Sequence, residues 1–143
     1  MLSNKFLPKE MEITFKELDI NSKIIIKLDK DKNFIFLSKS FEKISNFTKR
    51  ELIGRNFNLI VHQFISKEML EEIWRNLNSG KKWKGAIIFK NKEGKFFWSD
   101  IEFFPIDEKG NIIEDYTKIK GYIAVLKDLS FYDKQKAIKI ILN

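Results

Sequence analysis

Lysines and aromatic rings alternate along one stretch of this sequence, residues 79–100, and both residue types can act on a ligand. The stretch reads SGKKWKGAIIFKNKEGKFFWSD and holds six lysines and five large aromatic residues. In one interpretation the cations follow phosphates while the rings stack on bases, as in a single-stranded nucleic-acid binder. In the other interpretation the stretch forms two strands whose rings close over a buried small molecule. The rest of the chain has to decide between them.

The residue types that several kinds of catalysis and cofactor attachment need are missing from the sequence. It has no cysteine, which excludes disulfides, cysteine-bound zinc, iron–sulfur clusters and a cysteine–flavin photoadduct. It has one histidine, His62, so a metal site with several histidine ligands is excluded as well. It contains no glycine-rich phosphate loop, no nucleophile–base set and no carboxylate pair with metal-ligand spacing. The sequence therefore predicts a protein that is not an enzyme.

Charge and hydropathy along the chain exclude further classes of protein. The formal charge is +7 at pH 7, but basic and acidic residues alternate in sign along most of the sequence. This pattern is typical of a solvated lysine-rich surface, and we expect no nucleic-acid partner. No apolar run approaches about 18 residues, so we expect no membrane span within this chain. The absence of cysteine fits a reducing compartment, and we expect a cytoplasmic protein.

Side chains that act on a ligand must be held by regular elements, and residue periodicity predicts where these lie. Aromatic and β-branched runs between polar turns predict strands at residues 22–29, 33–38, 83–90, 95–106 and 119–128. Apolar residues at spacings of three and four predict a helix at residues 67–78, with Ser66 as its N-cap. Short helical pieces precede it. The order indicates an α+β domain whose helices cover one face of a sheet, with space for a ligand between the two layers.

Side-chain alternation along residues 95–106 decides which of these residues face that space. Asp100 and Glu102 point outward, so the inward set is Phe97, Ser99, Ile101 and Phe103. On the preceding strand the set that lies together is Trp83, Gly85, Ile87 and Phe89. Gly85 leaves room there for a close neighbour. Ser99 either hydrogen-bonds a ligand or bonds its own sheet or a buried water.

Several rings of the lysine-rich stretch are thus needed inside the domain, which favours the small-molecule interpretation over the nucleic-acid one. The outer face still carries Phe96, Trp98 and Phe104. Apolar side chains on an otherwise exposed sheet face are expected to pack against another element, either a terminal helix or a second subunit.

The order of elements and several short motifs resemble a PAS domain. In the segment LDKDKNFIFLSKSFEKISNFTKRELIGRN, Asn46-Phe47-Thr48 corresponds to the Gly-Tyr-Thr-like corner of that family, and Glu51 to Gly54 corresponds to its Glu-Leu-Ile-Gly. Asp128-Leu129-Ser130 resembles the Asp-Ile-Thr exit of the family. The resemblance covers roughly residues 20–130. It implies the PAS fold, a five-stranded antiparallel sheet with short helices on one face.

Within that family the middle of the chain is similar to the flavin-binding PAS domain of aerotaxis receptors. That subfamily has an Asn-x-x-Arg-His-Pro-Asp-Met-Pro segment, a helix with a Trp, then Gly-x-x-Trp-x-Gly and Asn-Gly-x-x-Tyr-Trp. The positions in register here are Asn58, His62, Trp74, Gly80, Trp83, Gly85, Gly94, Phe97 and Trp98. The residues that depart from the segment are Val61, Gln63, Phe64 and Ser66, in place of its Arg, Pro, Asp and second Pro. Of the residues tied to FAD in that subfamily, only His62 is kept.

The resemblance implies a sensory domain with FAD as the favoured cofactor; haem, a smaller apolar ligand or an empty pocket are the alternatives. The candidate cofactor-binding residues are Asn58, His62, Trp74, Trp83, Phe89, Ser99, Ile101 and Phe103. His62 contacts the ligand, ligates haem iron, or lies at the surface where a helix begins. Trp74 is a cavity wall or plain core, and Asn58 is a ligand donor or a turn former. A PAS domain with a filled core would instead be a protein–protein interaction module.

The predicted division of the chain is a capping helix at residues 1–20, the PAS sensor domain at residues 21–129 and a signalling or dimerisation helix at residues 130–143. The last helix is predicted to begin at Ser130, and its apolar seam consists of Ala137, Ile138, Ile141 and Leu142. A ligand or its redox state is expected to move the last strand and this helix. The expected partners are a second copy of the chain, bound through the terminal helices and the outer sheet face, and a signalling protein of the chemoreceptor or kinase type.

Overall fold

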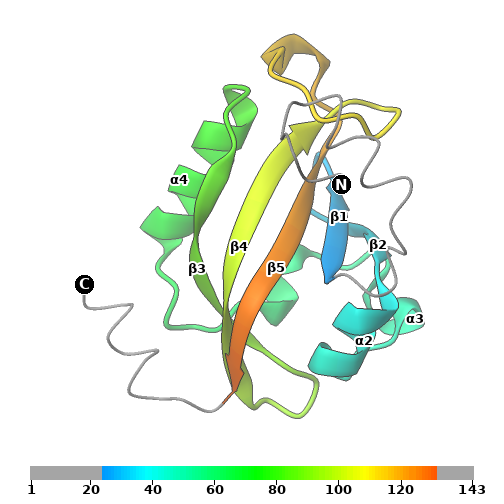
Figure 1. Ribbon diagram of the computed structural model, residues 1–143, viewed down its shortest axis with the longest axis vertical. Helices are drawn as coiled ribbons and strands as arrows, with labels where there is room; N and C mark the ends of the chain where they lie inside the picture. The colour runs from blue at the N-terminus through cyan, green and yellow to red at the C-terminus, as the bar shows by residue number, and fades with distance from the viewer. Residues whose placement is uncertain (1–23, 132–143) are drawn as a thin grey trace, which may run out of the picture.

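One sheet of five strands organises the computed structural model, which describes residues 24–131 (Figure 1). The strands are β1 (Ile25–Asp29), β2 (Phe34–Leu37), β3 (Trp83–Lys90), β4 (Phe96–Ile106) and β5 (Gly121–Phe131). Their order is β2-β1-β5-β4-β3, and every neighbouring pair is antiparallel. The last strand therefore lies between the first and the fourth. The predicted α+β class and antiparallel five-stranded sheet are confirmed.

Between β2 and β3 the chain forms short helical elements: α2 (Lys39–Ser45), α3 (Lys49–Leu52), η2 (Phe57–Ile60) and α4 (Lys67–Asn78). A further 3₁₀ turn, η3 (Tyr116–Lys118), precedes β5. The Oγ of Ser66 accepts a hydrogen bond from the backbone N–H of Met69, which caps the start of α4. Gly80 follows the end of α4 with a φ of +85°, where a Cβ would be strained and would collide with Glu114. The predicted helix at residues 67–78 and its cap are confirmed.

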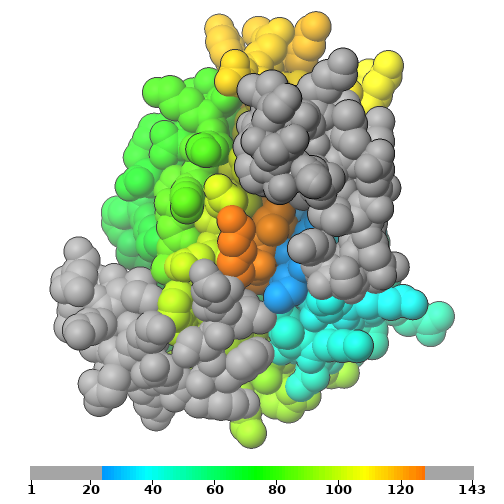
Figure 2. All heavy atoms as spheres, in the orientation of Figure 1, coloured from blue at the N-terminus to red at the C-terminus, as the bar shows by residue number. Residues whose placement is uncertain are grey.

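The main core lies between these helices and one face of the sheet. The fully buried apolar residues of the helical elements on this side are Phe41, Leu52, Phe57, Ile60, Ile73 and Leu77. The opposite sheet face carries a smaller buried cluster of Ile25, Phe104, Ile106 and Ile123. Seen in Figures 1 and 2, α4 (green) lies on one flank of the molecule, whereas α2 and α3 (cyan) lie toward the other.

The rings that the sequence predicts inward on β3 and β4 are buried in the main core cluster, but Trp98, which the sequence places on the outer face, is buried in the same cluster. Trp83 lies opposite Phe103 and Phe89 lies opposite Phe97, and each of these side chains is at most 8% exposed. A Cβ added to Gly85 would lie 2.5 Å from Cη2 of Trp83, closer than two carbon atoms can pack. The Trp83 ring therefore folds over Gly85, which leaves the room that the sequence predicts.

The end of β5 corrects one prediction. The sequence predicts a strand that ends at Asp128 and a helix that begins at Ser130. In the structure Ser130 and Phe131 still belong to β5, where they pair with Trp98 and Phe97 of β4. The longer β5 gives the first residues of β4 backbone hydrogen-bond partners. Without it, the backbone groups of β4 that face β5 would have none there. The rest of the two predicted terminal helices falls within residues 1–23 and 132–143, outside the described part of the chain.

Candidate functional site

Phe57 fills the centre of the space between the helices and the sheet. Its backbone N–H donates to the carbonyl oxygen of Lys32 at 2.8 Å, which fixes η2 against the β1–β2 turn. From there the side chain points into the core and is 0% exposed. The centroid of its ring lies 5.7 to 6.2 Å from those of Phe34, Trp74, Phe89 and Phe103. At this level the predicted chamber is packed with aromatic rings rather than open.

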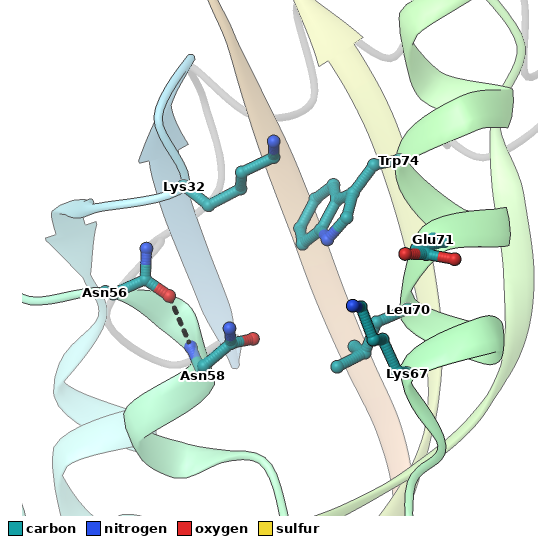
Figure 3. Close-up of a pocket in the computed structure, with 7 residues that line it drawn as sticks. All are labelled: Lys32, Asn56, Asn58, Lys67, Leu70, Glu71 and Trp74. Carbon is teal, nitrogen blue, oxygen red and sulfur yellow. Dashed lines mark hydrogen bonds between the residues drawn. The ribbon is translucent and has the colours of Figure 1, made fainter.

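Beside this ring cluster, a cleft of about 260 Å³ opens between the β1–β2 turn, η2 and the first half of α4 (Figure 3). It is lined by Lys32, Asn56, Asn58, Lys67, Leu70, Glu71 and Trp74. The Oδ1 of Asn56 accepts a hydrogen bond from the backbone N–H of Asn58 at 2.9 Å, which caps η2. Two of the predicted site residues, Asn58 and Trp74, thus come together at one cleft.

Two lysines flank this cleft on opposite sides. Lys32 adopts a positive φ of 66° in the β1–β2 turn, and its Nζ lies 5.4 Å from the centroid of the Trp74 ring, a cation–π contact. Lys67 is the first residue of α4 and is exposed. Neither lysine forms an ion pair with any residue in the part of the chain that the structure describes. With Glu71 as the one acidic residue of the lining, the side chains of the cleft sum to a net positive charge.

Trp74 connects the cleft to the sheet. It is half-buried: one part of the ring lines the cleft, and the rest packs on Phe57, Phe103 and Tyr122. Tyr122 lies on β5, and its hydroxyl donates a short hydrogen bond to Oδ1 of Asn78 at the end of α4. Burial raises the pKa of Tyr122, so this hydroxyl stays protonated at neutral pH. A continuous set of contacts therefore runs from the cleft through Trp74 to Tyr122 on β5.

His62 lies away from the cleft, beside the edge of β3. Its backbone N–H donates to the carbonyl oxygen of Ile88, and its Nδ1 accepts a hydrogen bond from the N–H of Phe64 at 3.1 Å. Its ring contacts the rings of Phe64 and Phe96, at centroid distances of 4.5 and 5.1 Å. Partial burial, and to a smaller extent Lys90, lowers the pKa of His62. Three roles were open for His62: a ligand contact, a haem ligand, or a surface residue where a helix begins. Its position just before α4 and away from the cleft corresponds to the third role.

Ser99 bonds its own sheet. Its Oγ lies 2.7 Å from the carbonyl oxygen of Lys127 and accepts a hydrogen bond from the Lys127 N–H at 3.1 Å. The register between β4 and β5 shifts between Trp98 and Asp100, so the hydroxyl replaces ladder bonds that the bulge interrupts. The observed contact is thus the sheet-bonded alternative of the two that the sequence left open.

The remaining predicted site residues, Trp83, Phe89, Ile101 and Phe103, are buried on the inner face of the sheet. Sequence reasoning missed Phe57, Lys32 and Lys67. Asn56, which precedes an apolar residue in the position of a helix cap, is the signal that could have placed Phe57 inside. No sequence signal identifies Lys32 and Lys67 as neighbours of one cleft, because this depends on how the β1–β2 turn and α4 pack relative to each other.

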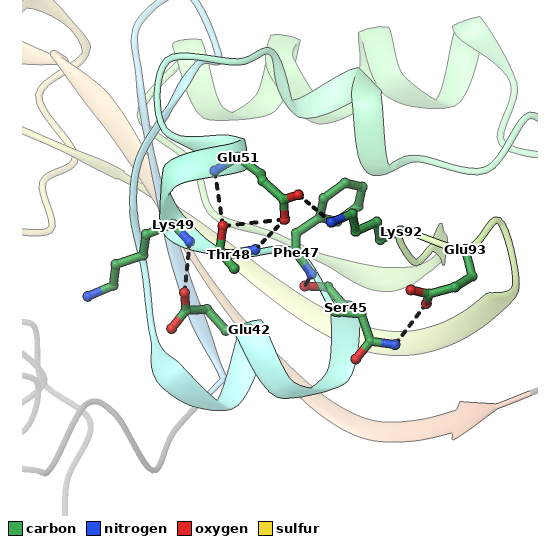
Figure 4. Close-up of polar contacts among 9 residues, drawn as sticks. Glu42, Ser45, Phe47, Thr48, Lys49, Glu51, Lys92 and Glu93 are labelled. Atoms are coloured by element: carbon green, nitrogen blue, oxygen red, sulfur yellow. Dashed lines mark hydrogen bonds and ion pairs between the residues drawn. The ribbon is translucent and has the colours of Figure 1, made fainter.

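A second polar cluster ties α2 and α3 to the β3–β4 turn, and we call it the α3 network (Figure 4). Thr48 and Glu51 form a complete capping box around α3. Glu51 also pairs with Lys92, which lowers the pKa of its carboxyl group. The side-chain amide of Asn46 donates to Glu93 at 2.8 Å. Every polar side chain of this network thus has a protein partner.

Within residues 24–131, no group of three or more His, Asp or Glu side chains is placed to hold a metal ion. In the same range no helix is both long enough and apolar enough to cross a membrane.

Comparison with known proteins places the chain in a family. The family described as PAS domain matches residues 21–131. The aerotaxis receptor of Escherichia coli (strain K12) is 27% identical over 86 residues, which cover 60% of this chain and 16% of the receptor. The PAS domain of a protein from Colwellia psychrerythraea is 21% identical, with a TM-score of 0.67 over 82% of this chain and 95% of that one.

A blue-light activated histidine kinase from Erythrobacter litoralis shares the fold at a TM-score of 0.60 and 13% identity, covering 76% of this chain and 34% of the kinase. The chain thus spans under a fifth of the length of the receptor it resembles in sequence. The sheet order, the helical cover on one face and the match over residues 21–131 agree. This chain belongs to the PAS domain family, and part of it is similar in sequence to the aerotaxis receptor.

Proposed function

We propose that this domain is a sensory module that binds a small ligand at the cleft beside α4 and passes the change to a signalling partner through β5. The observation that carries the proposal is the double contact of Trp74, which lines the cleft and also packs on Tyr122. Tyr122 pairs with Leu28 of β1 and with Pro105 of β4, so a shift of its ring reaches both neighbouring strands. The role is non-catalytic, and the cytoplasmic location stays a prediction.

The proposal predicts that a change at Trp74 alters β5 selectively. We expect Trp74→Leu to speed amide hydrogen exchange in residues 121–126 more than in β2, because the ring no longer supports Tyr122. Tyr122→Phe should produce part of the same pattern by removing the bond to Asn78. Ile35→Ala, at a residue that is 51% exposed on β2, is the control and should leave β5 unchanged. Equal acceleration over all strands would show loss of stability without coupling and would contradict the proposal.

A flavin, with FAD as its favoured form, is the cofactor that the similarity to aerotaxis receptors supports. The packing sets a condition for it. A flavin ring between α4 and the sheet would need the position that the Phe57 ring holds, so the residues as packed do not fit one. Phe57→Ala is therefore expected to bind FAD more tightly than the native chain, measured by quenching of flavin fluorescence on titration. Equally tight binding by both chains would show that Phe57 does not block the flavin, and no FAD binding by either chain would remove the flavin proposal.

The filled core favours a second candidate, a PAS interaction module without a resident ligand. An absorbance spectrum of the freshly purified protein separates the candidates, because flavin, haem and no chromophore give different spectra. Native mass spectrometry of the same sample would detect a colourless ligand. A protein that carries no small molecule and still binds its signalling partner would support the second candidate over the first.

Self-association through the chain ends and the outer sheet face is also proposed. Because β5 continues to Phe131, the informative deletion begins after that residue. Removal of residues 132–143 is expected to weaken the dimer, measured by sedimentation equilibrium. A deletion variant that associates as strongly as the native chain would exclude these residues from the interface.

A further inference from the structure

The cleft beside α4 carries more hydrogen-bond donors than the described protein uses. The Nζ atoms of Lys32 and Lys67 and the side-chain amide of Asn58 border one cavity, with Leu70 and Trp74 as its apolar wall (Figure 3). Within residues 24–131 these three donor groups make no side-chain hydrogen bond and no ion pair; the only partner of Lys32 there is the Trp74 ring. Donors from separate elements that border one cleft and lack a protein acceptor are available to a ligand in that cleft.

The charge of this cleft favours an anion. Its lining contains two lysines and one acidic residue, Glu71, so the sum of side-chain charges is positive. Lys67 also opens the twelve-residue helix α4, whose first turn adds the partial positive charge of its free backbone N–H groups. The dipole alone would define no site, but here it acts in the same direction as the two lysines.

The wall of the cleft favours a flat, unsaturated group. Trp74 is half-buried, and its exposed part lies between Lys32 on one side and Leu70 on the other. An aromatic ring that stacks on this indole gains contact area and the offset-stacked geometry that aromatic pairs prefer. The ammonium of Lys32, now above the indole, can turn to an anionic substituent of the same ligand.

The size of the cleft limits the ligand. Its volume of about 260 Å³ is below the range of roughly 300–1,000 Å³ that is typical of sites for drug-sized ligands. Behind Trp74 the fully buried Phe57 closes the way to the deeper core. A dinucleotide exceeds this space, whereas one or two fused rings with a single charged group match it.

The geometry points to a binding site for a small aromatic anion, one or two fused rings that bear a carboxylate or a phosphate. Lys32 and Lys67 hold the anionic group from two sides, Asn58 donates a hydrogen bond to it, and the rings stack on Trp74. This inference rests on the proposed function, because it names the ligand class of the same cleft. It concerns the cleft outside Phe57 and not the interior position that a flavin would need.

The test compares four probes by NMR titration of the ¹⁵N-labelled chain: 1-naphthyl phosphate, 1-naphthoate, 1-naphthol and inorganic phosphate. The two naphthyl anions should shift the amide signals of Asn58, Lys67 and Glu71 and should bind at least about fivefold more tightly than naphthol. Inorganic phosphate alone should bind more weakly than either, since it lacks the ring. The ratio between 1-naphthyl phosphate and 1-naphthoate then distinguishes the two anionic groups.

Charge variants make the test specific. Lys32→Gln and Lys67→Gln should each weaken the naphthyl anions about fivefold and leave naphthol unchanged, whereas Glu71→Gln should tighten the anions. Lys109→Gln, an exposed lysine on the β4–β5 connection, removes the same charge elsewhere and should have no effect. Equal affinity for naphthol and the anions, or no shift up to about 10 mM probe, would overturn the inference. The amide hydrogen exchange of Trp74→Leu is measured without these probes. It therefore tests the proposed sensory coupling independently of the anion site.

Discussion

The α3 network and the cleft beside α4 are both polar clusters at the rim of one core, but only the first satisfies its own charges. In the α3 network, Glu51 takes bonds from Thr48 and Lys92, and Glu93 takes a bond from Asn46. At the cleft, Lys67 and Asn58 have no side-chain partner among the described residues. The first cluster holds two elements of the fold together. The second leaves its donors without an acceptor among the described residues, which is the basis of the proposed anion site.

The largest expected effect is at Phe57, the residue that separates the cleft from the core. We expect Phe57→Ala to lower the free energy of unfolding by about 3–5 kcal/mol, because the ring contacts four others and leaves a cavity. Urea denaturation measures this loss. Phe64→Ala removes the same ring at a residue that is 47% exposed and should cost under about 1 kcal/mol. Similar losses for the two variants would show that Phe57 is not the centre of the core.

Within the α3 network the capping box should carry the measurable stability. Thr48→Ala removes the hydroxyl that accepts from the Glu51 N–H at 3.2 Å, and we expect a loss of about 1 kcal/mol in the free energy of unfolding. Thr48→Ser keeps the hydroxyl and is the matched control. If both variants lose the same amount, packing of the Thr methyl group, and not the cap, would be the cause.

At the cleft, the contrast predicts that charge can be removed without loss of stability. Lys67→Gln should change the free energy of unfolding by less than about 0.5 kcal/mol, since the ammonium has no described partner. The same variant should lose affinity for anionic probes. A substantial loss of stability would mean that Lys67 is part of the scaffold, and the difference between the two clusters would disappear.

The smallest expected effect concerns pH. The hydrogen bond from Lys92, and next the one from the Thr48 N–H, lowers the pKa of Glu51 from its ordinary value of 4.5. A group whose pKa is lower in the folded state stabilises the fold above its unfolded pKa, and this contribution is lost as pH falls through the folded pKa. Lys92→Gln should therefore raise the titration midpoint of the Glu51 carboxyl, followed by carbon-detected NMR. Lys109→Gln should leave the midpoint in place, and a midpoint that ignores Lys92→Gln would refute the pairing.

Most of the fold could be predicted because its signals are local. The stripe of apolar residues and Ser66 define α4, and alternation on β3 and β4 separates inner from outer side chains. The end of β5 could not be predicted in this way. Ser130 near its end resembles a helix cap in the sequence, but Ser130 and Phe131 are kept in the strand by pairing with Trp98 and Phe97, which are far away in sequence.

The candidate site was predicted less well, for a related reason. Strand alternation correctly turns Phe89 and Phe103 inward, but it cannot tell whether inward rings border a chamber or fill it. That depends on Phe57, which a different segment places between them. Likewise the alternation places Ser99 inside but does not reveal the bulge that engages its hydroxyl with Lys127.

The position of β5 in the sheet bears on how the chain folds as it is made. β1 pairs only with β2 and β5, and β4 pairs only with β3 and β5 among the described strands. Synthesis runs from the N-terminus, so the two halves of the sheet emerge from the ribosome as separate hairpins with open edges. They can join only after residues 121–131 are released, about a hundred residues after β1, and closure of so long a loop is intrinsically slow. Until then the exposed hairpin edges are the part of this protein most open to chaperones and to aggregation.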